Sequence, residues 1–113
     1  GNAKFSGQVV VGKKVIFSPF NADVVGVLDT SIQAEDLQFS VIGLGGLVRG
    51  DHKFNGTAAV IDNVVYFAPF DADVIGVFDT AANEGKGEFS TISLEGKVSE
   101  EYKQMEVNFQ GQQ

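Results

Sequence analysis

Cysteine and tryptophan are absent from the 113 residues, and histidine occurs once, at position 52. Without cysteine the chain has no disulfides, no thiolate zinc sites and no cysteine nucleophile. With one histidine, a serine nucleophile has at most one imidazole to act as its base. We interpret His52, which lies between Asp51 and Lys53, as a connecting residue. The sequence therefore predicts that the protein is not an enzyme, with no catalytic residue and no cofactor.

Positive charge is scarce and long apolar runs are missing. Eight Lys and Arg stand against 15 Asp and Glu, which gives a formal net charge of −7. This charge repels phosphate backbones at long range, so nucleic acid is not expected as a partner. No apolar run approaches the roughly 18 residues of a membrane span, and no signal-peptide pattern opens the chain. We therefore expect a soluble protein without a transmembrane segment of its own.

What the chain has instead is a repeat. The segment "PFNADVVGVLDT" at 19–30 recurs as "PFDADVIGVFDT" at 69–80, and nine of its twelve positions are identical. The matching residues are 49 apart before this segment and 50 apart within and after it, so the second copy carries one extra residue upstream of Pro69. A period near 50 residues is typical of repeat architectures.

This periodicity divides the chain into a first repeat at 1–49, a second repeat at 50–99 and a tail at 100–113. The tail resembles the start of a third repeat, because Tyr102-Lys103 corresponds to His52-Lys53. The alternation of Met105, Val107 and Phe109 with polar residues predicts an additional strand there, which could complete a neighbouring sheet.

Each repeat contains four short runs rich in Val, Ile and Phe, separated by turn residues. They lie at 7–11, 14–20, 24–30 and 37–44 in the first repeat and at 57–61, 63–70, 74–80 and 88–94 in the second. No segment has a helical period, so the predicted fold class is all-β, with two four-stranded antiparallel repeats. Apolar residues at consecutive positions, as in Val15-Ile16-Phe17, indicate strands covered on both faces. We therefore expect the sheets to stack.

Two features recur within the third strand of each repeat. Gly26 and Gly76 lie in the middle of the strand, where glycine often marks the close approach of another backbone. Asp29 and Asp79 end the strand, and each is followed by threonine. Because aspartate side chains can bond to their own backbone two residues on, we expect a side-chain turn at each of these ends.

Paired acidic and amide residues recur at the second turn of each repeat, as Asn21 with Asp23 and Asp71 with Asp73. Oxygen ligands at i and i+2 could contribute to a calcium site, which needs six to eight oxygens. These turns lack the glycine and the distal glutamate of an EF-hand loop. We therefore favour ordinary hairpin turns, in which these side chains bond to their own backbone, over a metal site.

The pattern "VVYFAPFDADVIGVFDT…FSTISLEG" is similar to the repeats of YVTN-type and kelch-like β-propellers, and it resembles most closely the multi-copy repeats of dinoflagellate algal proteins. The absence of tryptophan fits the YVTN-type better than kelch. The resemblance covers nearly all of residues 1–98 and implies that each repeat is one propeller blade. By analogy of source, it also implies an accessory subunit of an algal photosynthetic complex, located in the plastid.

Two blades do not close a ring, since propellers typically use four to eight. Two apolar sheet faces would then stay open, and each would carry on the order of 10 kcal/mol of unrealised burial. The expected partners are other protein chains that supply further blades or a host complex, or identical chains that close the ring. Our leading hypothesis is a non-catalytic scaffold or protein-interaction subunit. The alternative is a small lectin-like binder that closes a propeller by homo-oligomerisation.

Overall fold

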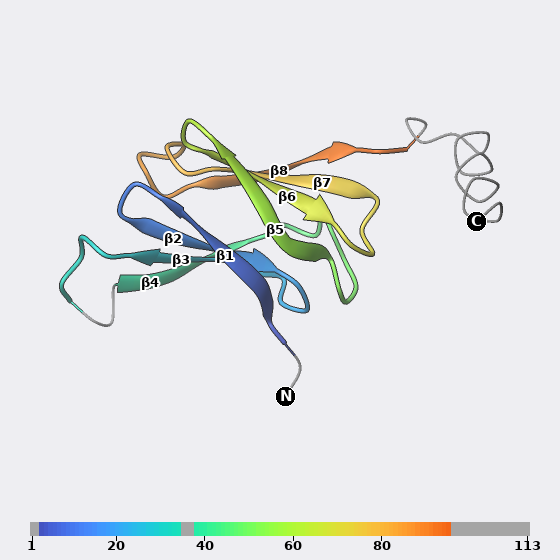
Figure 1. Cartoon of the computed structure of the whole chain (residues 1–113), viewed down its shortest axis with the longest axis horizontal. Helices are drawn as coiled ribbons and strands as arrows, with labels where there is room; N and C mark the ends of the chain where they lie inside the picture. The colour runs from blue at the N-terminus through green and yellow to red at the C-terminus, as the bar shows by residue number, and fades with distance from the viewer. Residues whose placement is uncertain (1–2, 35–37, 96–113) are drawn as a thin grey trace, which may run out of the picture.

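A computed structural model describes residues 3–34 and 38–95, and every element in them is a β-strand. The strands form two four-stranded antiparallel sheets, each a meander in chain order, stacked one on the other (Figure 1). The first sheet contains β1 (Phe5–Val11), β2 (Lys14–Pro19), β3 (Val24–Asp29) and β4 (Phe39–Gly43). The second contains β5 (Phe54–Ile61), β6 (Val64–Pro69), β7 (Val74–Asp79) and β8 (Glu88–Ser93). The all-β prediction is confirmed, and neither sheet closes on itself.

All eight predicted runs form strands, with one sheet in each repeat. The predicted tail strand through Met105, Val107 and Phe109 lies outside the described residues. Across 3–34 and 38–95, no helix is both long and apolar enough to traverse a bilayer.

The first strand of each sheet begins earlier than its apolar run predicts, and it contains a bulge. In β5, Phe54 pairs with Pro69 and Ala58 with Phe67, so three residues of β5 lie between these pairs, opposite one residue of β6. In β1, Phe5 pairs with Pro19 and Gln8 with Phe17, so two residues of β1 lie opposite one residue of β2. The extra residue of the second repeat is therefore located in the β5 bulge.

Each sheet has two faces, because side chains alternate across a strand. We call the face that carries the phenylalanines of the strands the aromatic face and the other the aliphatic face. The aromatic faces carry Phe5, Val10, Val15, Phe17, Leu28, Phe39 and Val41 in the first sheet, and Phe54, Val60, Val65, Phe67, Phe78, Phe89 and Thr91 in the second. The aliphatic faces carry Val9, Val11, Ile16, Val25, Val27 and Ile42 in the first, and Ala59, Ile61, Tyr66, Ile75, Val77 and Ile92 in the second.

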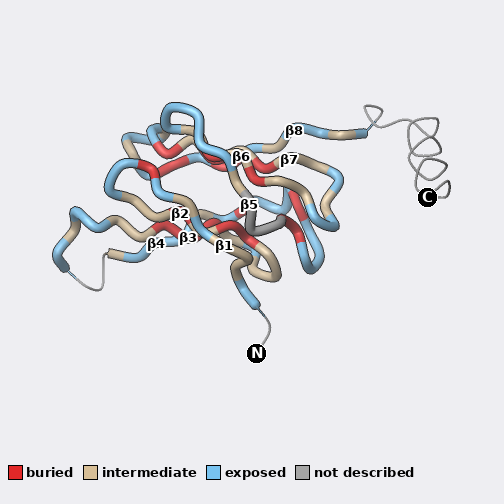
Figure 2. The backbone as a smooth tube through the Cα atoms, in the orientation of Figure 1, coloured by how far each residue is buried: buried red, intermediate tan, exposed pale blue. Residues whose placement is uncertain are grey.

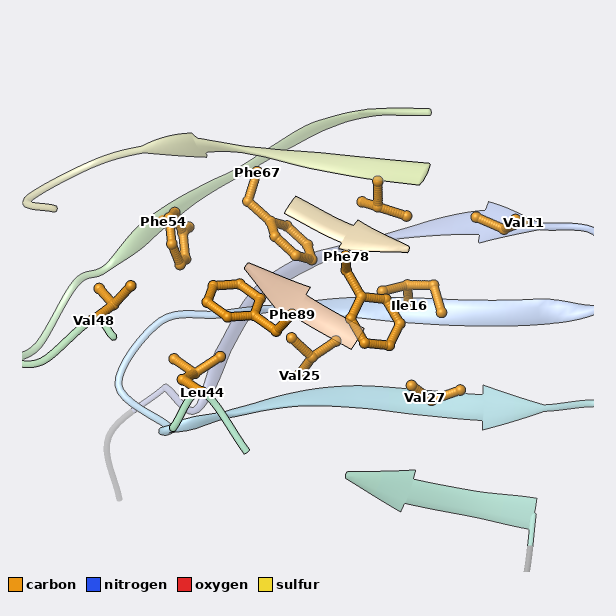
Figure 3. Close-up of a cluster of buried hydrophobic side chains, with 11 residues drawn as sticks. Val11, Ile16, Val25, Val27, Leu44, Val48, Phe54, Phe67, Phe78 and Phe89 are labelled. Carbon is orange, nitrogen blue, oxygen red and sulfur yellow. The ribbon is translucent and has the colours of Figure 1, made fainter. Parts of the chain in front are cut away.

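The core lies where the aliphatic face of the first sheet meets the aromatic face of the second. Buried positions gather between the two sheets (Figure 2). Figure 3 shows the side chains of this core, which include Leu44 and Val48 from the connection between the sheets. The sheets approach most closely at β1 and β5, where Ser6 Oγ donates a hydrogen bond to Phe54 O at 2.8 Å. The predicted stacking of the sheets is thus present, but it covers one face of each.

The mid-strand glycines make room for phenylalanine rings and not for another backbone, so that prediction was wrong. A Cβ atom at Gly76 would lie 2.9 Å from Phe54 Cζ and 3.0 Å from Phe67 Cδ2. A Cβ atom at Gly26 would lie 3.1 Å from Phe39 Cζ, in the equivalent place on the first sheet. Each glycine therefore leaves the space above the third strand that the rings of its aromatic face occupy.

Candidate interaction surfaces

The turn between β2 and β3 contacts the start of the second repeat through an ion pair and hydrogen bonds. Lys53 is 1% exposed, and its Nζ lies 3.0 Å from Asp23 Oδ1. Its backbone N–H also donates to Phe20 O at 3.0 Å, and its Nζ lies 3.4 Å from the same oxygen. A buried ammonium group is tolerated where it is paired and hydrogen-bonded. Lys53 is therefore the polar link at the junction between the two sheets.

His52 adds a second set of contacts to this junction. Its backbone N–H donates to Asn21 Oδ1 at 3.0 Å, and its ring stacks on Phe20 with centroids 4.8 Å apart. His52 Nδ1 lies 3.3 Å from Asp71 Oδ2. The prediction that Asn21 bonds its own backbone was wrong, since its side-chain oxygen accepts a hydrogen bond from the next repeat. These contacts agree with the interpretation of His52 as a connecting residue.

The four calcium candidates lie in two separate turns. Asn21 and Asp23 face the start of the second repeat, and Asp71 faces His52. Asp73 occupies the equivalent turn of the second sheet and is exposed. Among residues 3–34 and 38–95, no three His, Asp or Glu side chains come together as metal ligands would.

The ends of β3 and β7 are closed as predicted, by aspartate side chains. Asp29 Oδ1 accepts hydrogen bonds from Ser31 Oγ at 2.6 Å and from Ser31 N at 3.0 Å. Ala81 N donates to Asp79 Oδ1 at 3.0 Å in the second sheet. These hydrogen bonds, the hydroxyl first, together with the charge of Lys14, hold the pKa of the Asp29 carboxyl below its ordinary value.

The threonine after each aspartate ties the third strand to the first turn of its sheet. Thr30 Oγ1 donates to Lys13 O at 2.6 Å, and Thr80 Oγ1 donates to Asn63 O at 2.7 Å. Nearby, Lys14 Nζ donates to Gly85 O at 2.6 Å and so bridges the two sheets. The repeated Asp-Thr pair is therefore explained by the architecture of the sheet, and not by a chemical site.

No sheet formed by residues 3–34 and 38–95 covers the aromatic face of the first sheet. Val10 is 66% exposed, Phe39 44% and Val41 51%. The Phe17 ring lies between Phe5 and Phe39, with centroids 5.7 and 6.0 Å away. The result is an ordered apolar surface across all four strands. Contiguous exposed apolar patches of this kind mark interaction sites.

The aliphatic face of the second sheet is the other open surface. Ile61 is 62% exposed and Ile92 49%, at opposite edges of this face. Phe70, in the turn after β6, is 58% exposed, although its counterpart Phe20 is stacked under His52. The sequence predicts two open apolar faces, and five of the eight exposed large apolar side chains lie on them, namely Val10, Phe39, Val41, Ile61 and Ile92.

The residue that sequence reasoning missed is Lys53. Its signal was present, because Lys-Phe recurs at the start of both repeats as Lys4-Phe5 and Lys53-Phe54. In the first repeat, Lys4 is exposed. The difference between the two lysines arises only from the packing of a preceding sheet against the second one.

Comparison of the chain with protein-family models, with curated proteins and with solved structures finds no match.

Proposed function

We propose that this chain is a non-catalytic scaffold or protein-interaction subunit, in which the two sheets are blades of a β-propeller-type stack. The observation that carries the proposal is the one-sided packing of the sheets. The aliphatic face of the first sheet and the aromatic face of the second are buried together, and no sheet in the described part of the chain covers the two remaining faces. Both open faces have the composition of a sheet that another sheet covers.

The size of each open face also favours a protein partner. Four strands spaced about 4.8 Å apart and roughly six residues long cover about 400 Å² in projection. At about 25 cal/mol per Å², covering such an area contributes on the order of 10 kcal/mol. This is comparable to the whole stability of a small domain. A partner that presents a flat apolar surface would gain most of this free energy.

Hydrophobic-dye binding and native mass test the proposal together. We expect the wild-type chain either to bind the dye as a monomer or to self-associate. The double variant Phe39→Lys/Ile92→Lys should do neither while keeping the wild-type circular dichroism spectrum. Gln33→Lys, on an exposed loop residue, is the matched control for added charge and should behave as wild type. A wild-type monomer that binds no dye would refute the proposal.

A narrower part of the proposal concerns the larger complex to which the scaffold belongs. This part is supported only by the resemblance to algal repeats. On that ground we propose an accessory subunit of an algal photosynthetic complex, located in the plastid. Immunolocalisation and co-sedimentation with solubilised thylakoid complexes test it. A chain found only outside the plastid would contradict this part and leave the scaffold proposal in place.

Glycan binding, the alternative function, has less support. Sugar-binding sites commonly use Trp or Tyr platforms with polar neighbours. The sequence has no tryptophan, and Tyr66 is the only tyrosine in 3–34 and 38–95. We therefore assign the open faces to protein contacts.

A further inference from the structure

We propose that the partner of each open face is a second copy of this chain, docked head to tail. In this arrangement the aromatic face of one copy's first sheet covers the aliphatic face of the other copy's second sheet. The inference rests on the proposed function and names the partner. The template for it is the interface inside the chain, where a first-sheet aliphatic face already meets a second-sheet aromatic face.

The open aromatic face repeats the face that is already docked. Phe5, Phe17 and Phe39 occupy the positions of Phe54, Phe67 and Phe89 in the second sheet. The latter three are at most 8% exposed in the core. The glycine that makes room for the rings is also present in both sheets. A surface that packs against an aliphatic sheet once is therefore presented a second time, and no sheet among residues 3–34 and 38–95 covers this second surface.

The open aliphatic face matches the docked aliphatic face, and its largest change of size is at one position. Ile75, Val77 and Ile92 replace Val25, Val27 and Ile42 at equivalent positions. Tyr66 replaces the smaller Ile16.

The change of size has a counterpart on the open aromatic face. Inside the chain, the Phe78 ring points toward Ile16 (Figure 3). In the docked pair, Tyr66 would meet Leu28, which replaces Phe78. A larger residue on one face then meets a smaller one on the other. Volume-conserving exchanges of this kind are the ones that packed interfaces tolerate best.

The two residues of the ion pair at the junction between the sheets also have equivalents elsewhere in the chain. Lys53 pairs with Asp23 inside the chain at 3.0 Å. The equivalent residues, Lys4 and Asp73, are both exposed; Lys4 immediately precedes β1, and Asp73 lies in the turn between β6 and β7. Docking by the same geometry brings Lys4 of one copy to Asp73 and Phe70 O of the other. Opposite charges at matching places fix the register of the two sheets.

The contact is heterologous, because the two faces that meet are different. Such contacts produce rings when the rotation per chain closes and filaments when it does not. A two-fold dimer would instead pair two aromatic faces or two aliphatic faces, and it would leave Lys4 and Asp73 apart. The two arrangements therefore predict different behaviour of single-face variants.

A mixing experiment with the full chain distinguishes them. Phe39→Lys damages only the open aromatic face, and Ile92→Lys damages only the open aliphatic face. We expect each variant alone to lose association by at least about 100-fold, because a lysine would be buried without a partner. Mixed together, the two variants should form a 1:1 dimer that grows no further, since one intact face of each kind remains. Sedimentation velocity and native mass spectrometry measure both results.

Charge reversal gives a second measurement that does not alter the apolar faces. Lys4→Glu and Asp73→Lys should each weaken association about 3- to 10-fold, and the double variant should recover it. Both side chains are exposed in the single chain, so folding should be unchanged. Failure of the double variant to recover association would overturn the proposed register.

The remaining outcomes overturn the inference in distinguishable ways. If only Phe39→Lys prevents association, the contact is a two-fold one between aromatic faces, and if only Ile92→Lys does, it is a two-fold one between aliphatic faces. If the wild-type chain is a dye-binding monomer, the partner is a different protein, and the proposed function still stands. If it is a monomer that binds no dye, the chain covers its own faces, and both proposals fail.

Discussion

Phe17 and Phe67 occupy the same position in the two repeats, yet Phe67 is fully buried and Phe17 is only half-buried. Both rings lie on an aromatic face beside a glycine of the third strand. The difference comes from position along the chain, because only the second sheet has a sheet stacked against its aromatic face. Phenylalanines at equivalent positions therefore contribute differently to the free energy of unfolding. The difference between them indicates how much stability Phe17 would gain if another sheet covered its face.

The largest expected effect is a core truncation. Phe67→Ala should lower the free energy of unfolding by about 3–5 kcal/mol, the range for a buried phenylalanine. Phe17→Ala should cost only about 1–2 kcal/mol, since part of that ring is already in water. Urea titration in the Ile92→Lys background, which should keep the chain monomeric, measures both. Equal costs in that background would contradict the one-sided packing.

A smaller difference should separate the two mid-strand glycines. Gly76→Ala should cost about 1–3 kcal/mol, because the new methyl group pushes against rings that are locked in the core. Gly26→Ala should cost less than about 1 kcal/mol, since Phe39 and its neighbours can move toward the open side. Gly43→Ala, with no atom within 4 Å of its added Cβ, is the control. Thermal unfolding in the monomeric background would show the order.

The two lysines that begin the repeats should differ in the same direction. Lys53→Met, which keeps an apolar stem, should lower monomer stability by about 1 kcal/mol through loss of the charged contacts with Asp23 and Phe20 O. Lys4→Met should change it by less than about 0.5 kcal/mol, because the side chain is exposed. Denaturant midpoints of the two variants give the comparison. A cost for Lys4→Met at high protein concentration alone would indicate the inter-copy contact.

The smallest effect concerns the aspartate turns. The folded-state pKa of Asp29 is depressed, so its contribution to stability is present above the unfolded pKa and is lost as pH falls through the folded value. Ser31→Ala removes the hydroxyl donor and should raise the pKa of Asp29 toward its ordinary value. Carboxyl-detected NMR titration measures this shift, with Ser40→Ala as control. An unchanged pKa would mean that the Ser31 amide and Lys14 suffice.

The strands were predictable because Val, Ile and Phe runs are bounded by turn residues at regular spacing. The early starts of β1 and β5 were not, since a bulge breaks the alternation there. The sequence also did not show which face of each sheet would pack against the other sheet. Both faces of each strand are apolar, and only the pairing register decides which residues share a face. Lys53 was missed for a related reason. A charged residue is read as exposed until a second sheet covers it.

The bulge at the start of β5 has a consequence for how the length of such repeats can change. A one-residue slip in a regular strand transfers every following side chain to the opposite face. In β5 the additional residue is absorbed between Phe54 and Ala58, and Phe54 still pairs with Pro69. Insertions at this point thus leave the identities of the two faces intact. The bulge therefore accommodates a change in strand length. A reporter amino acid could be inserted there without exchanging the aromatic and aliphatic faces of the sheet.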